Sequence, residues 1–246
     1  RHDVDLLPKN SLLTAKIEHE LGIVGSYYFR AVPESWDEQI IKEIADLGHE
    51  VGYQYENLTT CNGDFSLAIE DFKKNLEALR QLVLVTTICM HGSPRSKYDS
   101  KDLWKYYNYK DYGIIGEPYF EVDFSKVLYL TDTGRRWDGY KVSVRDKVEQ
   151  TELQKRYSFH STQDIIIKAQ RYKGTKVQSE VEKEMQSDSL PLCGGRVGDG
   201  GFLPSQIIIT VHPQRWTNNP VLWMKELVMQ NLKNTLKKII VKQSSK

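Results

Sequence analysis

The chain begins with Arg1-His2-Asp3-Val4-Asp5, a segment that carries two carboxylates two residues apart. Side chains at positions i and i+2 of a strand point to the same face, so a strand here directs Asp3 and Asp5 toward one pocket. Two such carboxylates can divide the chemistry: one binds a cation or is held by a base, and the other accepts a proton. The structural alternative is a helix cap or a salt bridge with Arg1.

Four more reactive side chains stand directly after apolar runs. In a βα barrel the carboxyl ends of all strands converge on one face, where active sites are built. A single histidine after a strand is more often structural, but several reactive groups at equivalent places predict a shared pocket. The four are His91, Asp132, His160 and His212, which follow residues 85–90, 127–131, 157–159 and 207–211.

Helical and strand-like segments alternate along the chain. Helices are predicted to begin near Asn10, at a capping box formed by Ser35 and Glu38, at Ser66 and at Asn219. Strand–helix–strand repetition with short loops indicates parallel strands joined by right-handed crossovers. We therefore expect residues 1–246 to form one α/β domain, a single (β/α) barrel, with a doubly wound open sheet as the alternative. Strands are expected at residues 23–29, 49–55, 85–90 and 207–211.

Five short segments resemble, in order, the motifs of the polysaccharide deacetylase superfamily, which comprises carbohydrate esterase family four and its divergent relatives. The similarity is greatest to the branch associated with bacterial surface-polysaccharide gene clusters, and it covers most of the chain. The segments are RHDVD (residues 1–5), GHEVGYQYE (48–56), HGSP (91–94), DTGRRWD (132–138) and VHPQRW (211–216).

This resemblance implies a distorted seven-stranded barrel that removes an acetyl group from a glycan or sugar precursor. A divalent metal, which would be zinc, cobalt or nickel, polarises the acetyl carbonyl and activates water. The resemblance makes Asp3 the base and His212 the general acid, and it gives the metal to Asp5 and His91. The carbohydrate is assigned to Gln54, Asp132, Trp137 and Trp216.

Two departures from the family pattern keep a second function open. The two metal-binding histidines of the family's second motif are replaced by Gln54 and Leu58, and Val4 separates the usual adjacent aspartates. A leucine cannot bind a cation and an amide oxygen is a poor zinc ligand. The alternative is a non-catalytic relative that binds glycan without turnover. The retained reactive residues favour the hydrolase, because a pure binder does not need them all.

Composition excludes several other classes of protein. The net charge is +1, from 34 basic and 33 acidic residues, so no global field favours nucleic acid. No apolar run reaches the roughly 18–20 residues of a membrane-spanning helix. A soluble protein, in the cytoplasm, is the expectation. Three scattered cysteines predict no disulfide framework. The polar, glycine-rich residues 186–201 are expected to form a surface loop.

Overall fold

A computed structural model describes residues 1–93, 96–135, 137, 148–157, 159–170 and 204–244 of the chain. The strands are β1 (His2–Val4), β2 (Ser26–Phe29), β3 (Glu50–Tyr55), β4 (Ile88–Met90), β5 (Leu128–Thr131) and β6 (Ile207–Thr210). The α-helices are α1 (Pro8–Glu20), α2 (Glu38–Asp46), α3 (Asn57–Thr60), α4 (Phe65–Arg80), α5 (Pro118–Glu121), α6 (Glu152–Arg156) and α8 (Pro220–Ser244). Short 3₁₀ turns are η1 (Ser100–Lys105), η2 (Tyr109–Tyr112) and η4 (Pro213–Arg215).

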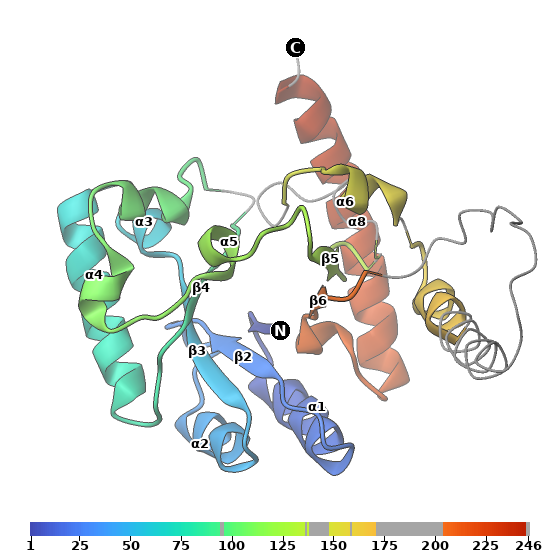
Figure 1. The fold of residues 1–246 in the computed structure, drawn as a ribbon, viewed down its shortest axis with the longest axis horizontal. Helices are drawn as coiled ribbons and strands as arrows, with labels where there is room; N and C mark the ends of the chain where they lie inside the picture. Colours follow the sequence, from blue (N-terminus) through green and yellow to red (C-terminus); the bar gives the residue numbers. More distant parts are fainter. Residues whose placement is uncertain (94–95, 136, 138–147, 158, 171–203, 245–246) are drawn as a thin grey trace, which may run out of the picture.

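All strand pairs of the described residues are parallel. One sheet has the order β1-β2-β3-β4, and β5 pairs with β6 in a second sheet. A parallel bridge between His2 and Val211 joins β1 to the end of β6, since the amide of Asp3 donates to the carbonyl oxygen of Val211. The two sheets thus form one continuous parallel array, which curves through the molecule in Figure 1. A further bridge adds Gly116 beside Thr87 at the β4 edge.

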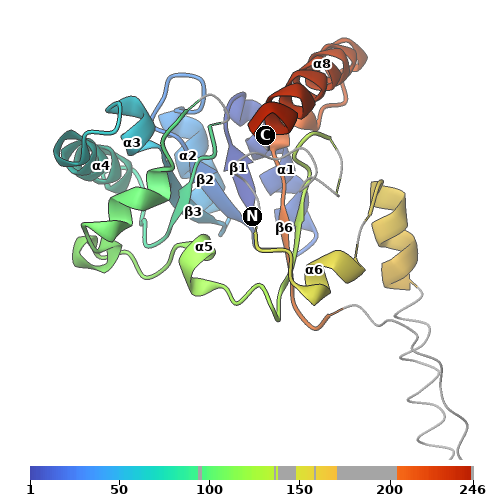
Figure 2. The ribbon, with the colours of Figure 1, turned by 90° about the horizontal axis from the view of Figure 1, so that it is seen from above.

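The outer face of the first sheet carries the main hydrophobic core. Val4, Phe29 and Tyr53 lie side by side in the strand register and are almost fully buried. The periodic apolar residues of α2 and α4, among them Ile41 and Phe72, pack against this face. Figures 1 and 2 show both helices on the outside of the strands. Because side chains alternate along a strand, the residues between these core positions point to the opposite, inner face.

The inner face is polar and closely fitted around a tyrosine. Tyr28 lies between Asp3 and Gly52 in the register, and its hydroxyl donates to Oγ1 of Thr87 at 3.1 Å. Thr87 in turn donates to Glu50 at 2.6 Å. The Tyr28 ring crosses β3 directly over Gly52, where a Cβ would lie 2.4 Å from ring atom Cε1. Glycine at this position therefore makes room for the Tyr28 ring on the inner face.

Gly52→Ala should lower the free energy of unfolding by about 1–3 kcal/mol, because the added methyl group overpacks the Tyr28 ring. Urea unfolding measures this change. Gly116→Ala is the matched control, since a Cβ at Gly116 would meet only Cγ of Glu121 at 3.9 Å. Equal stability of the Gly52 variant and the wild type would contradict the packing described here.

Two predicted helix starts are wrong. The capping box at Ser35 does not form: Asp37 caps α2 by accepting from the amide of Ile40, while Ser35 donates to the carbonyl oxygen of Val4. Nor does Asn10 cap α1, which begins at Pro8. The Asn10 side-chain amide instead donates to two main-chain carbonyl oxygens, that of Pro213 in η4 and that of Trp216. In both cases a side chain suited to capping finds a partner far away in the sequence, which no local pattern reveals.

The α/β class and the parallel strands are confirmed. Among the described residues no ladder of hydrogen bonds joins Gly116 to β5, so a single closed barrel is not shown. No helix within these ranges is long and apolar enough to cross a membrane. Cys61 and Cys89 are free thiols. Cys193 and residues 186–201 lie outside the described residues.

Candidate functional site

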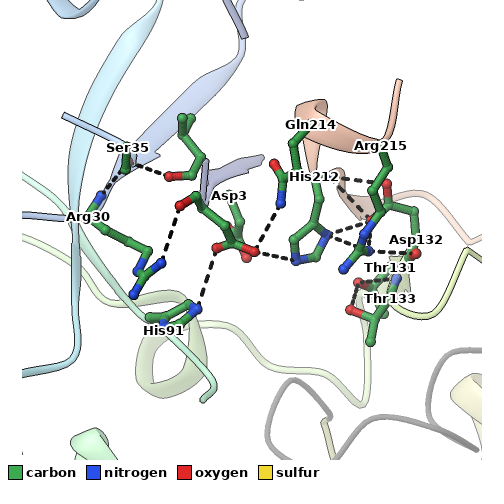
Figure 3. A network of polar contacts seen from close by, with 12 residues as sticks. Asp3, Arg30, Ser35, His91, Thr131, Asp132, Thr133, His212, Gln214 and Arg215 are labelled. Atoms are coloured by element: carbon green, nitrogen blue, oxygen red, sulfur yellow. Dashed lines mark hydrogen bonds and ion pairs between the residues drawn. The ribbon is translucent and has the colours of Figure 1, made fainter. Parts of the chain in front are cut away.

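Each strand of the described residues contributes a polar side chain just beyond its carboxyl end. Five of these residues come immediately after their strand, and His212 follows β6 by two positions. Parallel strands present their carboxyl ends at one edge of the array, so these side chains meet there. Figure 3 shows Arg30 and His91 on one side of the cluster, and His212, Asp132 and Arg215 on the other. The six are Asp5, Arg30, Glu56, His91, Asp132 and His212.

Asp5 lies between two histidines at the centre of the cluster. Nε2 of His91 is 3.5 Å from Oδ1 of Asp5, and Nε2 of His212 is 3.8 Å from Oδ2. The side-chain amide of Gln214 donates to Oδ2 at 3.0 Å, and Arg30 donates to the main-chain oxygen of Asp5 at 3.2 Å. Each carboxylate oxygen therefore faces a different imidazole, and the side chain is 18% exposed.

His212 is oriented by a buried aspartate. Its Nδ1 lies 2.5 Å from Oδ1 of Asp132, and its main-chain amide donates to the same carboxylate. Arg215 donates to Oδ1 at 2.8 Å, and the indole N–H of Trp216 donates to Oδ2 at 2.8 Å. With its carboxylate fully engaged, Asp132 holds the His212 ring so that Nε2 points toward Asp5.

The same contacts set the charges of the pair. Burial favours the neutral acid, but His212, Arg215 and Trp216 outweigh it, so the pKa of Asp132 is lowered and the group is ionised. For His212, burial and the Arg215 guanidinium disfavour the cation, whereas Asp132 and Asp5 favour it. The balance raises the pKa of His212 above its ordinary value. The arrangement thus favours an imidazolium next to Asp5, which is the form a proton donor needs.

A second carboxylate holds His91. Nδ1 of His91 lies 2.8 Å from Oε2 of Glu56, and Arg30 donates to Oε1 of Glu56 from both Nε and Nη2, at 2.8 and 2.6 Å. Burial raises the pKa of Glu56, but the contacts with His91 and Arg30 lower this pKa by more than burial raises it. The net shift is therefore downward. The site therefore contains two carboxylate–imidazole pairs that approach Asp5 from opposite sides.

Asp3 lies within β1, on the inner face of the sheet, two residues before Asp5. It is 3% exposed and pairs with the Arg1 guanidinium, whose Nη2 donates to Oδ2 at 2.9 Å. Its other oxygen, Oδ1, is buried and has no hydrogen-bond partner among the described residues. The salt bridge proposed as the structural alternative is thus formed. Between the two aspartates of the opening motif, Asp5 is the one that contacts histidines.

The sequence also predicted Gln54, Trp137, Trp216 and His160 as parts of the site. Gln54 is buried on β3, and within the part of the chain that the structure describes its Oε1 has no hydrogen-bond partner. Trp216 is 45% exposed, and its ring centroid lies 6.4 Å from that of Trp137, which bonds to Thr162 through its indole nitrogen. His160 lies exposed after α6, where its main-chain amide donates to Asp164 at 3.1 Å.

Sequence reasoning missed Arg30, Glu56 and the pair Gln214 and Arg215. Arg30 directly follows the apolar run of β2, and Glu56 directly follows that of β3. His91 and Asp132 were identified because each directly follows an apolar strand. The same rule applies to Arg30 and Glu56. Arg215 and Gln214 lie in η4, a turn whose orientation toward the site depends on tertiary contacts.

The donor set around Asp5 does not fit the metal ion that the resemblance implies. His91 and His212 face different oxygens of Asp5, and Leu58, at one of the family's histidine positions, is buried in the hydrophobic core. No group of three or more His, Cys, Asp or Glu side chains in the described part of the chain is placed to hold a metal. Zinc in proteins takes three or four protein ligands. The described residues therefore do not supply the further ligands that a zinc bound by Asp5 and His91 would need.

Comparisons with known proteins found no relative of this chain. No family model, no curated protein and no solved structure matches the chain. The case for a function accordingly depends on the geometry of the cluster around Asp5.

Proposed function

We propose that this protein is a carbohydrate-modifying hydrolase that removes an acetyl group from a glycan or sugar precursor. The observation that carries the proposal is a carboxylate, Asp5, placed beside an imidazole, His212, that a buried Asp132 orients and charges. A proton acceptor and a proton donor side by side are what hydrolysis of an amide or ester requires. Their place at the carboxyl ends of parallel strands supports an active site.

The reaction assigned to these residues has two proton transfers. Asp5 takes a proton from water as the water oxygen attacks the acetyl carbonyl carbon, which gives a tetrahedral oxyanion. The oxyanion collapses, the C–N or C–O bond breaks, and the His212 imidazolium gives its proton to the leaving amine or alcohol. Acetic acid departs and loses its proton to solvent. The proton on Asp5 returns to His212 through an intervening water, since Oδ2 and Nε2 are 3.8 Å apart. We assign the base to Asp5 instead of Asp3, because Asp3 is paired with Arg1.

An exposed indole beside the acid supports a carbohydrate substrate. Trp216 bonds to Asp132 through its nitrogen and remains 45% exposed. An aromatic ring held in this way offers a flat apolar face to a sugar ring while its polar edge stays hydrogen-bonded. We assign sugar stacking to Trp216 and Trp137, and a substrate contact to Gln54. The Asp132 carboxylate, which the resemblance assigned to the carbohydrate, is engaged by His212, Arg215 and Trp216, so we assign it to orienting the acid.

We also propose that the strands close into the distorted seven-stranded barrel that the resemblance implies. The bridge between β1 and residue 211 and the bridge between Thr87 and Gly116 support seven parallel strand positions around one axis. Arg1 reaches across the inner face, since Nη2 contacts the hydroxyl groups of Tyr119 and Tyr129.

A non-catalytic glycan-binding protein is the second candidate. It is favoured by Leu58, which packs in the core where the family has a metal ligand, and by Gln54 at the other ligand position. Such a protein would keep Trp216 and the polar cluster around Asp5 but release no acetate.

Acetate release distinguishes the two candidates. The purified chain is incubated with sugars and oligosaccharides that carry N-acetyl or O-acetyl groups, with and without added zinc, cobalt or nickel, and free acetate is measured by proton NMR. We expect acetate from at least one class of acetylated sugar. Glycan binding without acetate would establish the second candidate, and neither binding nor acetate would refute both.

Metal content is measured on the same preparation. Because the donor set does not fit a resident ion, we expect far less than one zinc, cobalt or nickel ion per chain. One ion per chain that is lost in Asp5→Ala would establish the metal site that the resemblance implies.

A further inference from the structure

The long C-terminal helix α8 turns a polar side toward the rest of the protein. Glu226, Gln230 and Asn234 lie on one face of the helix, because residues four apart in an α-helix are neighbours. Oε1 of Glu226 lies 3.9 Å from Nε of Arg215, and the side-chain amide of Asn234 donates to the carbonyl oxygen of Gly134 at 2.9 Å. Gln230 is buried and donates to Asn234 at 2.8 Å. Polar side chains therefore occupy the face that a surface helix normally fills with apolar residues.

The outward side of α8 is apolar. An α-helix turns about 100° per residue, so Val228 and Leu232, two positions before and after Gln230, lie about 160° from it. Both side chains are exposed, and Figure 2 shows α8 at the periphery of the molecule. A large exposed apolar surface marks a site of association with a protein or a membrane. The exposed apolar residues on this side are Val221, Leu222, Met224, Val228, Met229 and Leu232.

The same helix concentrates positive charge. Of the 34 basic and 33 acidic residues of the chain, 28 basic and 32 acidic residues lie before residue 220. Residues 220–246 therefore contain six basic residues, all lysines, and one acidic residue, Glu226. Lys225 and Lys233 are exposed next to the apolar residues. The net charge of +1 thus conceals a basic C-terminal segment, which complements an anionic surface.

The charge pattern favours a lipid surface over a second copy of the chain. In a symmetric dimer the same patch meets itself, so the lysines of one copy would face those of the other, and like charges oppose association. Glu226 lies on the inner face beside Arg215 and cannot pair with them. In a bilayer, anionic headgroups attract lysines, and the acyl chains beneath them accept apolar side chains.

We propose that α8 binds the surface of an anionic lipid bilayer. The side around Val228 and Leu232 lies at the boundary of the acyl chains, the lysines lie at the headgroups, and the polar face stays on the protein. The turn η4, which borders the cluster around Asp5, is joined to α8 by residues 216–219. Binding therefore brings the candidate site close to the bilayer. The proposal does not depend on the hydrolase function.

Sedimentation with sucrose-loaded vesicles tests the proposal on the purified chain. The vesicles contain phosphatidylcholine alone or an equimolar mixture of phosphatidylcholine and phosphatidylglycerol. We expect the protein to sediment with the anionic vesicles, to bind the neutral ones far more weakly, and to lose affinity as salt is added. Leu232→Glu should weaken binding to the anionic vesicles at least about tenfold, because it replaces an apolar side chain that the bilayer buries. Lys225→Gln and Lys233→Gln should each weaken it roughly fivefold.

Leu67→Glu is the matched control for Leu232→Glu. Leu67 is 61% exposed on α4 and Leu232 is 57% exposed, so the two substitutions make the same change of size and charge at similar exposure. Figures 1 and 2 show α4 and α8 on opposite sides of the molecule. Leu67→Glu should bind the anionic vesicles as the wild type does, and neither variant should change acetate release from acetylated sugars in solution.

Three outcomes would overturn the proposal. The first is a wild-type chain that does not sediment with the anionic vesicles. The second is undiminished binding by Leu232→Glu, or an equal loss in Leu67→Glu, since the apolar side of α8 would then contribute nothing specific. The third is a dimer, seen by sedimentation velocity without lipid, that Leu232→Glu dissociates, which would assign this side to a second copy. Vesicle binding by a chain that releases no acetate would refute the hydrolase and leave this proposal standing.

Discussion

Asp5→Asn should lower the kcat for acetate release by about 10²–10⁴-fold, the range that a general base contributes. The amide keeps the shape of the side chain but cannot take the proton from water. It also removes the negative charge that helps to keep His212 protonated. The measurement is the initial rate of acetate formation at saturating substrate, with the unfolding temperature recorded for each variant.

Asp46→Asn is the control for this substitution, since Asp46 is exposed at the end of α2. Its rate should match that of the wild type. A rate for Asp5→Asn within threefold of the wild type would contradict the assignment of the base.

Asp3→Asn decides between the two aspartates of the opening motif. The resemblance gives the base to Asp3, whereas the structure pairs Asp3 with Arg1. We expect Asp3→Asn to lower stability, because a buried guanidinium loses its charged partner. Correctly folded Asp3→Asn should keep most of its kcat. A loss of kcat in this variant as large as in Asp5→Asn would return the base to Asp3.

Asp132→Asn should lower kcat by about 10²–10⁴-fold and shift the pH profile. The Asp132 carboxylate is the largest of the effects that raise the pKa of His212, so its removal lowers that pKa. A raised pKa keeps the imidazolium present to higher pH. Without it, the alkaline limb of the profile should move to lower pH. Rates measured across the neutral and alkaline range, each at a pH where the variant is folded, test this prediction.

His212→Ala serves as the comparison for Asp132→Asn. Both variants impair the same proton donor, so their losses of kcat should be similar and far from additive in the double variant. A wild-type rate in His212→Ala would show that another group protonates the leaving atom. An unshifted pH profile in Asp132→Asn would show that Asp132 holds His212 without setting its charge.

Local sequence patterns predicted much of the framework. Apolar periodicity identified α2, α4 and most strands, because burial of one helix face or of alternate strand residues leaves a regular signal. The placement of reactive groups after apolar runs predicted that His91, Asp132, His160 and His212 gather in one place. His91 and His212 lie beside Asp5 and Asp132 pairs with His212, whereas His160 lies exposed after α6.

Other features were beyond the reach of local patterns. Asn10 and Ser35 have the side chains of helix caps, yet both bond to residues that are distant in the sequence. In α1 the apolar residues Leu13 and Ile17 are exposed, whereas Ser11 and Ala15 are buried. Small residues there allow close approach to the strands, a requirement set by the neighbouring elements.

The amino-acid sequence alone established that Asp3 and Asp5 share one face of a strand and that reactive groups gather at strand ends. Strand alternation and the parallel arrangement are local or topological rules, so they need no coordinates. The division of roles between the two aspartates required the tertiary structure. Asp3 lies within β1 and pairs with Arg1, whereas Asp5 lies just beyond the carboxyl end of β1, beside His91 and His212. Partners across strands depend on register and on contacts between residues as far apart as Asp5 and His212, and no local spacing specifies these.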